Sequence, residues 1–199
     1  MEQVSGQRTG AVSVVPRRAS KRPCWWVQDT PVGEIVVVSG NAGVQRIWLR
    51  RDELHTAASI GDARERRDRA VARQLDEWFA GTRRTFTLPV AWPADLSPFA
   101  RTVLETLVAR VPWGETVSYG ELAELAGRPR AARAVGSTMA GVTVPFVVPC
   151  HRVIAAGGRI GGYGDGHHAI ALKRWLLERE GVQLRGCPQA REVAIPSNP

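Results

Sequence analysis

The chain has 199 residues, of which 44% are hydrophobic and 23% are charged. This length allows one large domain or two small ones, each with a buried core, and the composition is that of a globular protein. No apolar run is long enough to cross a bilayer. The three cysteines, Cys24, Cys150 and Cys187, are too widely spaced for a disulfide framework or a metal-ligand motif. We therefore expect no metal site and no association with membranes.

The formal net charge is +8, and every cationic side chain except Lys21 and Lys173 is an arginine. Excess positive charge attracts polyanions, and a protein that neutralises phosphates gains affinity by releasing counterions. A bias toward arginine codons would give the same charge, so the composition permits nucleic-acid binding without establishing it. The N-terminus has no charged-then-apolar leader pattern, which predicts a cytoplasmic protein.

The first half of the chain is predicted to form a small antiparallel sheet with one helix. Residues 1–22 hold glycine, serine, proline and basic pairs without apolar periodicity, which predicts a flexible arm. Turn residues separate three β-prone runs: 25–27, 33–38 and 44–49. Apolar side chains at helical spacing predict a helix over 64–79 that ends at Gly81. A further strand is expected at 85–90 and a linker at 91–95.

The second half begins with a predicted helix at Ser97-Pro98, where serine caps the helix and proline takes its first position. Ser118 and Glu121 have the spacing of a capping box, which predicts the start of another helix. Residues 127–129 read as a turn, and 130–139 as a second helix. This pattern is typical of a helix-turn-helix.

The second helix of this pair is predicted to face DNA. Its small side chains would let it approach a sugar-phosphate backbone closely, although small residues serve helix–helix packing equally well. Arg130 and Arg133 are expected one turn apart on that same helix, and this basic pair favours the DNA-binding interpretation.

The apolar run 147–154 is interrupted by a proline and then by a cysteine with cationic neighbours. Pro149 has no N–H to give to a sheet, so the backbone must turn where Cys150 lies. The adjacent His151 and Arg152 are expected to favour thiolate over thiol, lowering the pKa from about 8.5 into roughly the 3.5–7.5 range. The alternative is that Cys150 is an inert buried cysteine, which is the commoner situation.

The Pro-Cys-His-Arg-Val segment resembles the active-site signature of the O6-alkylguanine-DNA alkyltransferases, which repair DNA by transferring an alkyl group to their own cysteine. Further blocks have the order and spacing of that family, so that the resemblance runs from Ser97 to Gly181: 116–123, 130–136, 161–163 and 173–181. The resemblance implies irreversible transfer from O6-alkylguanine, and from O4-alkylthymine, in a single turnover. It implies no cofactor.

The resemblance also implies a mixed α/β fold. A small ribonuclease H-like sheet-and-helix domain at 23–92 is expected to precede a mostly helical, winged helix-turn-helix-like alkyltransferase domain at 97–182. Residues 183–199 would form a C-terminal tail. The zinc ligands that some family members have in the first domain lack counterparts, because His55 and Cys24 stand alone. The expected partner is double-stranded DNA bound through its minor groove by a monomer.

The family's functional residues can be placed on this sequence. Those implied for catalysis are the nucleophile Cys150, the base His151, the glutamate that orients this base, Glu180, and the hydrogen-bond donor to the leaving guanine, Tyr119. Those implied for binding DNA or the flipped base are Arg133, Arg130, Ser118, Arg152, Val153, Tyr163 and Gly164. Arg133 would fill the gap left by the extruded base, and the Val153 carbonyl would accept a hydrogen bond from the guanine amine. An N–H of the loop after Tyr163 would support O6.

Two segments depart from the family pattern. Val142-Thr143 stands where the family has an asparagine that hydrogen-bonds the turn before the cysteine segment, so we expect that turn to be less well held and methyl transfer to be slower. The Thr143 hydroxyl could offset the loss. The loop 165–169 is about three residues longer than usual, and would either be a surface insertion or widen the pocket for larger adducts.

Three other functions are compatible with parts of this pattern. A lesion-binding module would flip and mark alkylguanine without transfer, although Cys150 argues against it. A relative of the alkyltransferases could act on bulky adducts or on a small-molecule alkyl donor. A Cys–His hydrolase would need Cys150 and His151 to face each other, which adjacent residues rarely do.

Overall fold

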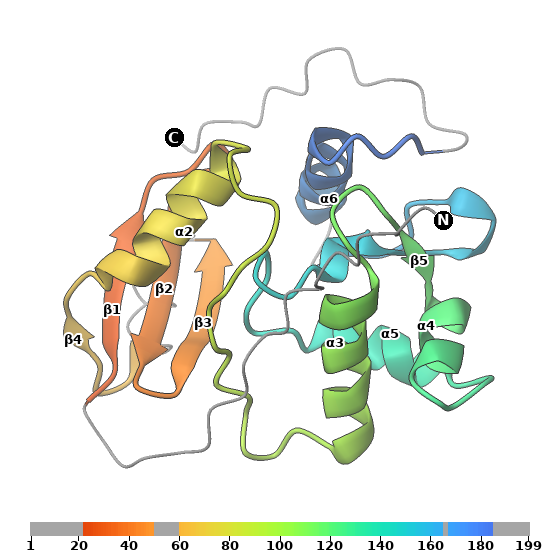
Figure 1. Cartoon of the computed structure of the whole chain (residues 1–199), viewed down its shortest axis with the longest axis horizontal. Coiled ribbons are helices and arrows are strands. Elements are labelled where there is room, and N and C mark those ends of the chain that lie inside the picture. Colours follow the sequence, from red (N-terminus) through yellow and green to blue (C-terminus); the bar gives the residue numbers. More distant parts are fainter. Residues whose placement is uncertain (1–21, 50–59, 165–166, 185–199) are drawn as a thin grey trace, which may run out of the picture.

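The computed structural model describes residues 22–49, 60–164 and 167–184, and shows two halves side by side (Figure 1). One half holds a four-stranded sheet with helix α2 packed on it, and the other holds helices α3 to α6. The fold is therefore mixed α/β, as predicted. None of the helices in the described ranges is both long enough and apolar enough to cross a membrane.

The sheet has the order β3-β2-β1-β4. Strands β1 (Cys24–Gln28), β2 (Ile35–Gly40) and β3 (Gly43–Leu49) are antiparallel and confirm the three predicted runs. Strand β4 (Arg64–Glu65) pairs with β1 in parallel, so the sheet is mixed rather than purely antiparallel. Figure 1 shows β3 at the edge nearest the helical half.

Helix α2 (Arg69–Phe79) begins five residues later than predicted. The cause is Asp68, whose carboxylate accepts the N–H groups of Ala70 and Val71 and so caps the helix there. The preceding residues pair with β1 instead. The helix ends as predicted before Gly81, which has a φ of +81°. The strand expected at 85–90 is absent, and only Val90 forms a bridge, to Val44.

The helical half begins with α3 (Pro98–Arg110), capped by the Ser97 hydroxyl as predicted. A two-residue strand, β5 (Val117–Ser118), leads into α4 (Tyr119–Leu125). The predicted capping box is confirmed, because the Ser118 hydroxyl accepts the Glu121 N–H while the Glu121 carboxylate accepts the Ser118 N–H. Helix α4 packs against α5 (Ala132–Ala140), and the turn 126–131 joins the two helices.

Helix α5 starts at Ala132, two residues later than predicted. Arg130 lies before the helix, with a φ of +71°, in a left-handed conformation that a non-glycine residue rarely adopts. Pro129 precedes it and cannot donate a backbone hydrogen bond, so the turn 127–131 continues past the predicted boundary. The prediction that Arg130 and Arg133 lie one turn apart on the same helix is therefore wrong.

The remaining elements follow the cysteine segment. A 3₁₀ helix (Cys150–Arg152) leads into strand β6 (Val153–Ile154), which pairs in parallel with β5. A second 3₁₀ turn (Ala156–Gly158) precedes helix α6 (His167–Arg179). The predicted long loop 165–169 is partly helical, because His167 to Ala169 belong to α6, while residues 165 and 166 lie outside the described residues.

The two halves share one buried core around Trp78 of α2. The Trp78 ring packs edge-on against Trp113, with ring centroids 5.8 Å apart, and contacts Phe146 at 5.7 Å. From α6, the Arg179 guanidinium donates to the carbonyls of Trp78 and Phe79 at the end of α2. These contacts fix the last helix of the chain against the first half.

Candidate active site

The backbone before Cys150 is tightly folded. Phe146 has a φ of +69°, a strained value for a large side chain, and its ring is buried against α2. The Val148 carbonyl accepts the Cys150 N–H at 2.8 Å, and the 3₁₀ helix follows directly. Because β6 then pairs with β5, the residue after β5, Tyr119, is brought to the same region as the cysteine. Local turns and this short parallel pair together place the thiol.

A cavity of about 660 Å³ lies beside the thiol. Its walls include Cys150, Tyr119 and the loop residues 162–164. Helix α5 contributes Gly136 and Met139 to the same cavity. A Cβ added at Gly136 would make only ordinary van der Waals contact with the Tyr119 ring, at 4.0 Å. The volume is within the usual range for small-molecule pockets, about 300–1,000 Å³.

The Cys150 thiol does not have the lowered pKa that its neighbours in sequence suggested. Burial raises the pKa of Cys150 to about 11, and a hydrogen bond to the Tyr163 hydroxyl at 3.8 Å and the charge of Lys173 offset only part of this. The prediction failed because the side chains of His151 and Arg152 point away, toward Glu180. At neutral pH the Cys150 side chain is therefore a thiol.

Behind the thiol lies a buried cluster of three charged or titratable side chains. Glu180 accepts a hydrogen bond from His151 Nε2 at 2.9 Å and two from the Arg152 guanidinium at 2.8 and 2.9 Å. The Gly114 N–H also donates to this carboxylate, at 3.3 Å. Burial alone would raise the pKa of Glu180, but the hydrogen bonds from His151 and Arg152 outweigh it and lower the pKa to about 2. Glu180 is thus an anion at neutral pH.

His151 is completely buried, and burial lowers its pKa despite the opposing effect of Glu180. A neutral imidazole must donate through Nε2 to the carboxylate, which leaves Nδ1 as the unprotonated acceptor. Nδ1 has no hydrogen-bond partner among the described residues. The Trp78 ring packs edge-to-face with the imidazole at 6.2 Å and restricts its orientation. The ring is therefore arranged as a base whose cationic form Glu180 would stabilise.

Lys173 is a site residue that the sequence reasoning missed. Its side chain is fully buried, and Nζ donates to the carbonyls of Val153 at 2.6 Å and Gly162 at 3.0 Å. Burial lowers the pKa of Lys173 to about 8, while the nearby Cys150 acts in the opposite direction. The sequence offered one indication of a special role for this residue: Lys173 is one of only two lysines in a chain that otherwise uses arginine.

The predicted base-binding residues lie around the cavity. The Tyr119 hydroxyl donates to the Gly162 carbonyl at 3.4 Å, and Tyr163 and Gly164 also line the cavity. The Val153 carbonyl, expected to accept from the guanine amine, already accepts from Lys173. A carbonyl has two lone pairs, so it can accept a second hydrogen bond.

The predicted DNA-binding residues fall into two groups. Arg133 and Arg130 are exposed on and before α5, and Ser118 is half-buried with its hydroxyl occupied by the helix cap. Arg152 is buried and bonded to Glu180 and to the Val111 carbonyl, because its fork of donors matches a carboxylate. Its role in binding DNA or the flipped base stays a prediction.

The turn at Val142-Thr143, which lacks the family asparagine, is held by a hydrogen bond from the sheet. The Thr143 carbonyl accepts the Ile47 N–H of β3 at 2.8 Å, and the Val142 N–H donates to Met139 at 3.4 Å. The Val142 side chain lines the cavity. A backbone bond from the first half thus supports this turn, instead of the Thr143 hydroxyl that the sequence suggested.

No group of three or more potential metal ligands occurs within the described ranges. Cys24, which has no companion ligand in the sequence, lies in β1 with its thiol 3.4 Å from the Ser39 hydroxyl. His55, which also stands alone in the sequence, lies outside the described residues.

The site combines a buried thiol, a buried imidazole bonded to a carboxylate, and a cavity bordered by α5, which carries the exposed Arg133. Comparison with known proteins agrees. The family profile described as "6-O-methylguanine DNA methyltransferase, DNA binding domain" matches residues 98–182. The methylated-DNA–protein-cysteine methyltransferase of Mycobacterium leprae is 37% identical over 159 residues, which are 78% of this chain and 91% of that protein.

Two further relatives define the extent of the match. The human methylated-DNA–protein-cysteine methyltransferase is 50% identical over 86 residues, 43% of this chain, so the match spans only 40% of the human protein. The crystal structure of Mycobacterium tuberculosis OGT in complex with DNA has a TM-score of 0.67 at 32% identity, covering 78% of this chain and 91% of that one. The chain belongs to the methylated-DNA–protein-cysteine methyltransferase family.

Proposed function

We propose that this protein repairs DNA by irreversible transfer of an alkyl group from O6-alkylguanine, and from O4-alkylthymine, to Cys150. One observation carries the proposal: a single cavity holds the buried thiol and Tyr119 and is bordered by α5, which also carries the exposed Arg133. The relatives are named for this transfer, and one was solved with DNA. No cofactor is needed, because the protein itself is the acceptor.

The target atom cannot be reached inside a stacked duplex, so the nucleotide must be flipped into the cavity. The Cys150 proton would pass through a water to Nδ1 of His151, since no direct hydrogen bond joins the two side chains among the contacts of the described residues. Glu180 would stabilise the imidazolium that forms. Because burial raises the pKa of the thiol, a base is needed to remove its proton before the sulfur attacks.

The thiolate sulfur would then attack the alkyl carbon, forming the C–S bond as the C–O6 bond breaks. The electron pair goes to the purine, which takes up a proton, with the Tyr119 hydroxyl as the donor that supports the leaving base. The positive charge of Lys173 would stabilise the sulfur anion. Its Nζ would also hold the carbonyls of Val153 and Gly162 in place by hydrogen bonds. The product is a thioether, and each molecule acts once.

The finer structural assignments belong to the same proposal. The exposed face of α5 would enter the minor groove with Arg133 in the gap left by the flipped base. The first half would be a ribonuclease H-like domain at 23–92, and the second a winged helix-turn-helix-like domain at 97–182. The arm 1–22 and the tail 183–199 lie largely outside the described residues. A monomeric, cytoplasmic protein completes the proposal.

The test is stoichiometric transfer. Purified protein is incubated with an excess of duplex DNA containing O6-[³H-methyl]guanine, and label bound to protein is compared with guanine restored in the DNA. We expect one methyl group per protein molecule and an equal amount of repaired guanine. Tight binding of the lesion without any transfer would favour the lesion-binding function instead.

Replacing Arg133 with alanine should slow repair of duplex DNA far more than transfer from a free O6-alkylguanine base. An inserted side chain offsets an unstacking cost of a few kcal/mol that a free base does not incur. The measurement is the second-order rate on both substrates, with Arg101→Ala, a half-exposed arginine of α3 beside Glu105, as the matched control. Equal losses on the two substrates would mean that Arg133 has a structural role.

Replacing Val142 with asparagine tests the departure from the family pattern. The Ile47 N–H already holds this turn through the Thr143 carbonyl, so we expect methyl transfer to change by no more than about twofold. Single-turnover rates of wild type and variant on methylated duplex decide the matter. A tenfold gain in the variant would show that the sheet contact is a poor substitute for the asparagine.

A further inference from the structure

Helix α2 ends without a cation of its own. Its last turn contains Asp76 and Glu77 but no basic residue, although the C-terminal end of a helix is the negative end of its dipole. Arg179 of α6 supplies the missing charge, because its guanidinium donates to the Trp78 carbonyl at 3.0 Å and to the Phe79 carbonyl. In Figure 1, α6 lies on the side of the molecule to which this end of α2 points. Two of the last carbonyls of α2 are thus bound from another element.

The two residues held in this way carry rings that pack against the His151 imidazole and against the turn before it. Trp78, which is 1% exposed, packs edge-on against His151 with ring centroids 6.2 Å apart. Phe79 packs edge-on against Phe146, at 5.2 Å, in the strained turn before Cys150. A displacement of the end of α2 would therefore move the surface against which the imidazole rests.

Arg179 is the last residue of α6 and Glu180 follows it directly, but the two side chains make different contacts. Glu180 accepts a hydrogen bond from His151 Nε2 at 2.9 Å, whereas Arg179 reaches α2. The Arg179 guanidinium also lies over the Trp175 ring, 5.3 Å from its centroid, and this contact restricts its position. The end of α6 therefore holds the imidazole in two ways: directly through the carboxylate, and indirectly through α2.

We propose that Arg179 is a positioning residue for alkyl transfer to Cys150. By binding the end of α2, it keeps Trp78 against the imidazole, so that Nε2 stays on Glu180 and Nδ1 is left to take the thiol proton. The inference rests on the proposed alkyl transfer and adds a residue to it. Arg179 does not line the cavity, so it acts on the orientation of the base and takes part in no bond that forms or breaks.

The experiment measures single-turnover methyl transfer at saturating O6-methylguanine duplex, together with the dissociation constant for the same duplex. Arg179→Met removes the charge and both hydrogen bonds but keeps an unbranched apolar side chain beside Trp175. We expect its transfer rate to fall about tenfold, because a small misplacement of a catalytic group slows a reaction strongly. The dissociation constant should stay within about twofold, because the cations on and before α5 are untouched.

Two further variants frame this result. Arg179→Lys should transfer within about threefold of wild type, since an ammonium supplies the same charge to the helix end. The matched control is Arg83→Met. The Arg83 guanidinium donates to the Glu77 carboxylate at 2.7 Å and to the Thr85 carbonyl at 3.0 Å, so its loss weakens the same end of α2 without releasing the carbonyls that Arg179 binds. This control should keep the wild-type transfer rate.

The pH dependence of the rate separates positioning from a general loss of stability. Burial lowers the pKa of His151, and the charged groups that act on it are Glu180, Arg152 and Lys173. None of these groups changes in the variants. If the Trp78 ring moves away, water reaches the imidazole and its pKa rises toward the ordinary value of about 6.5. Because the base acts in its neutral form, the rate of Arg179→Met should begin to fall at a higher pH than that of wild type.

The other possible results overturn the proposal. A wild-type rate in Arg179→Met would mean that the end of α2 keeps its place without the guanidinium. An equal loss in Arg83→Met, or a loss in Arg179→Met with an unchanged pH profile, would mean that Arg179 only stabilises the fold. Arg179→Lys as slow as Arg179→Met would show that the charge at the helix end does not position the base.

Absence of transfer by the wild type would reject the repair function itself, and this inference with it. Transfer by the wild type together with an unaffected Arg179→Met would reject the inference alone. If Arg179→Met does not fold, Arg179→Gln, which keeps a donor without the charge, decides by the same rate and pH profile.

Discussion

Replacing Cys150 with serine is expected to abolish alkyl transfer and to leave binding of methylated duplex within about threefold of wild type. A serine hydroxyl in this buried position is a far weaker nucleophile than sulfur, and His151 would have to remove a proton from a much weaker acid. The exposed Arg133 of α5 and Arg130 before it are untouched by the change. Transferred label and fluorescence anisotropy with the same duplex measure the two properties.

The matched control is Cys24→Ser, in the buried strand β1 away from the cavity. It should retain full transfer, even if it loses some stability. Residual transfer by Cys150→Ser would mean that another residue accepts the alkyl group. Loss of DNA binding in that variant would mean that the cysteine segment shapes the DNA-binding surface.

Replacing Glu180 with glutamine is expected to cause the largest loss of stability among these variants, together with a loss of transfer. The carboxylate is buried and receives hydrogen bonds from His151, Arg152 and Gly114. A neutral amide leaves the buried Arg152 charge uncompensated, which costs about 3–5 kcal/mol. For a protein of this size each kcal/mol is roughly 2–4 °C, so we expect the Tm at pH 7 to fall by about 6–20 °C.

The effect should depend on pH in a defined direction. The pKa of Glu180 is lowered from 4.5 to about 2, so its contribution, on the order of 3 kcal/mol, is complete above pH 4.5 and is lost as the pH falls toward 2. The pKa of His151 is also lowered, so in both proteins stability begins to fall below about pH 6.5. Thermal unfolding of wild type and Glu180→Gln between pH 7 and pH 3 should give two Tm curves that converge in acid.

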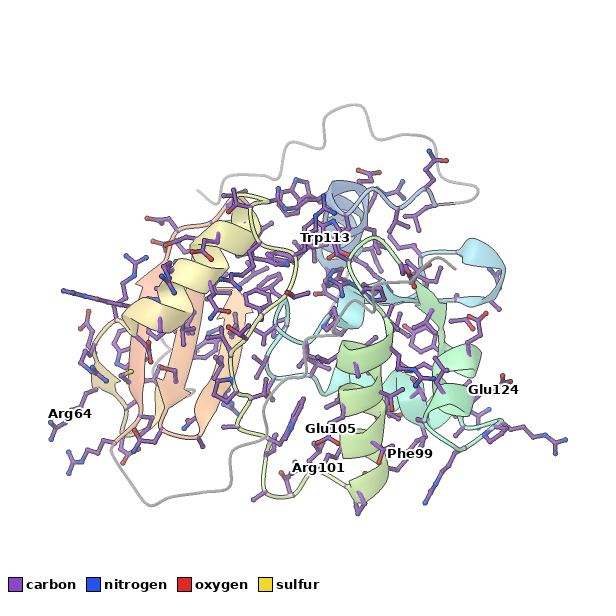
Figure 2. The ribbon with its side chains drawn as sticks, viewed as in Figure 1. Arg64, Phe99, Arg101, Glu105, Trp113 and Glu124 are labelled. Carbon is purple, nitrogen blue, oxygen red and sulfur yellow. The ribbon has the colours of Figure 1, made fainter. Side chains whose placement is uncertain are left out.

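A constant difference between the two curves would contradict the assignment of Glu180 as the stabilising anion. A second control separates stability from chemistry. Glu105→Gln removes an exposed carboxylate whose partner, Arg101, lies 3.8 Å away on the surface of α3 (Figure 2). Such pairs contribute little, so this variant should match wild type in Tm at every pH.

Local chemistry explains which elements the sequence could predict. The Ser97 cap and the Ser118–Glu121 box involve residues three apart, so their geometry follows from spacing alone. The start of α2 was misplaced because Asp68 offered a better cap than any residue before it. The left-handed conformation of Arg130 carries no compositional signal, since glycine or asparagine would be expected there.

In the site, too, some features could be predicted from the sequence and others depend on the tertiary structure. Cys150 and its partners in the family pattern could be placed by resemblance, but the electrostatics of the thiol could not, because neighbours in sequence need not be neighbours in space. The buried bonds of Arg152 to Glu180 and of Lys173 to Val153 join residues 28 and 20 positions apart. The contribution of β3 to the cavity depends on how the two halves pack, which no local pattern encodes.

The most direct test of the central claim locates the transferred group. Wild-type protein is exhausted with duplex DNA containing O6-methylguanine and digested with trypsin, which places Cys24, Cys150 and Cys187 in different peptides. The account predicts that the peptide containing Cys150 gains the mass of one methyl group in nearly every molecule, while the other two peptides are unchanged. An unmodified Cys150 peptide, or a methyl group on Cys24 or Cys187, would contradict it.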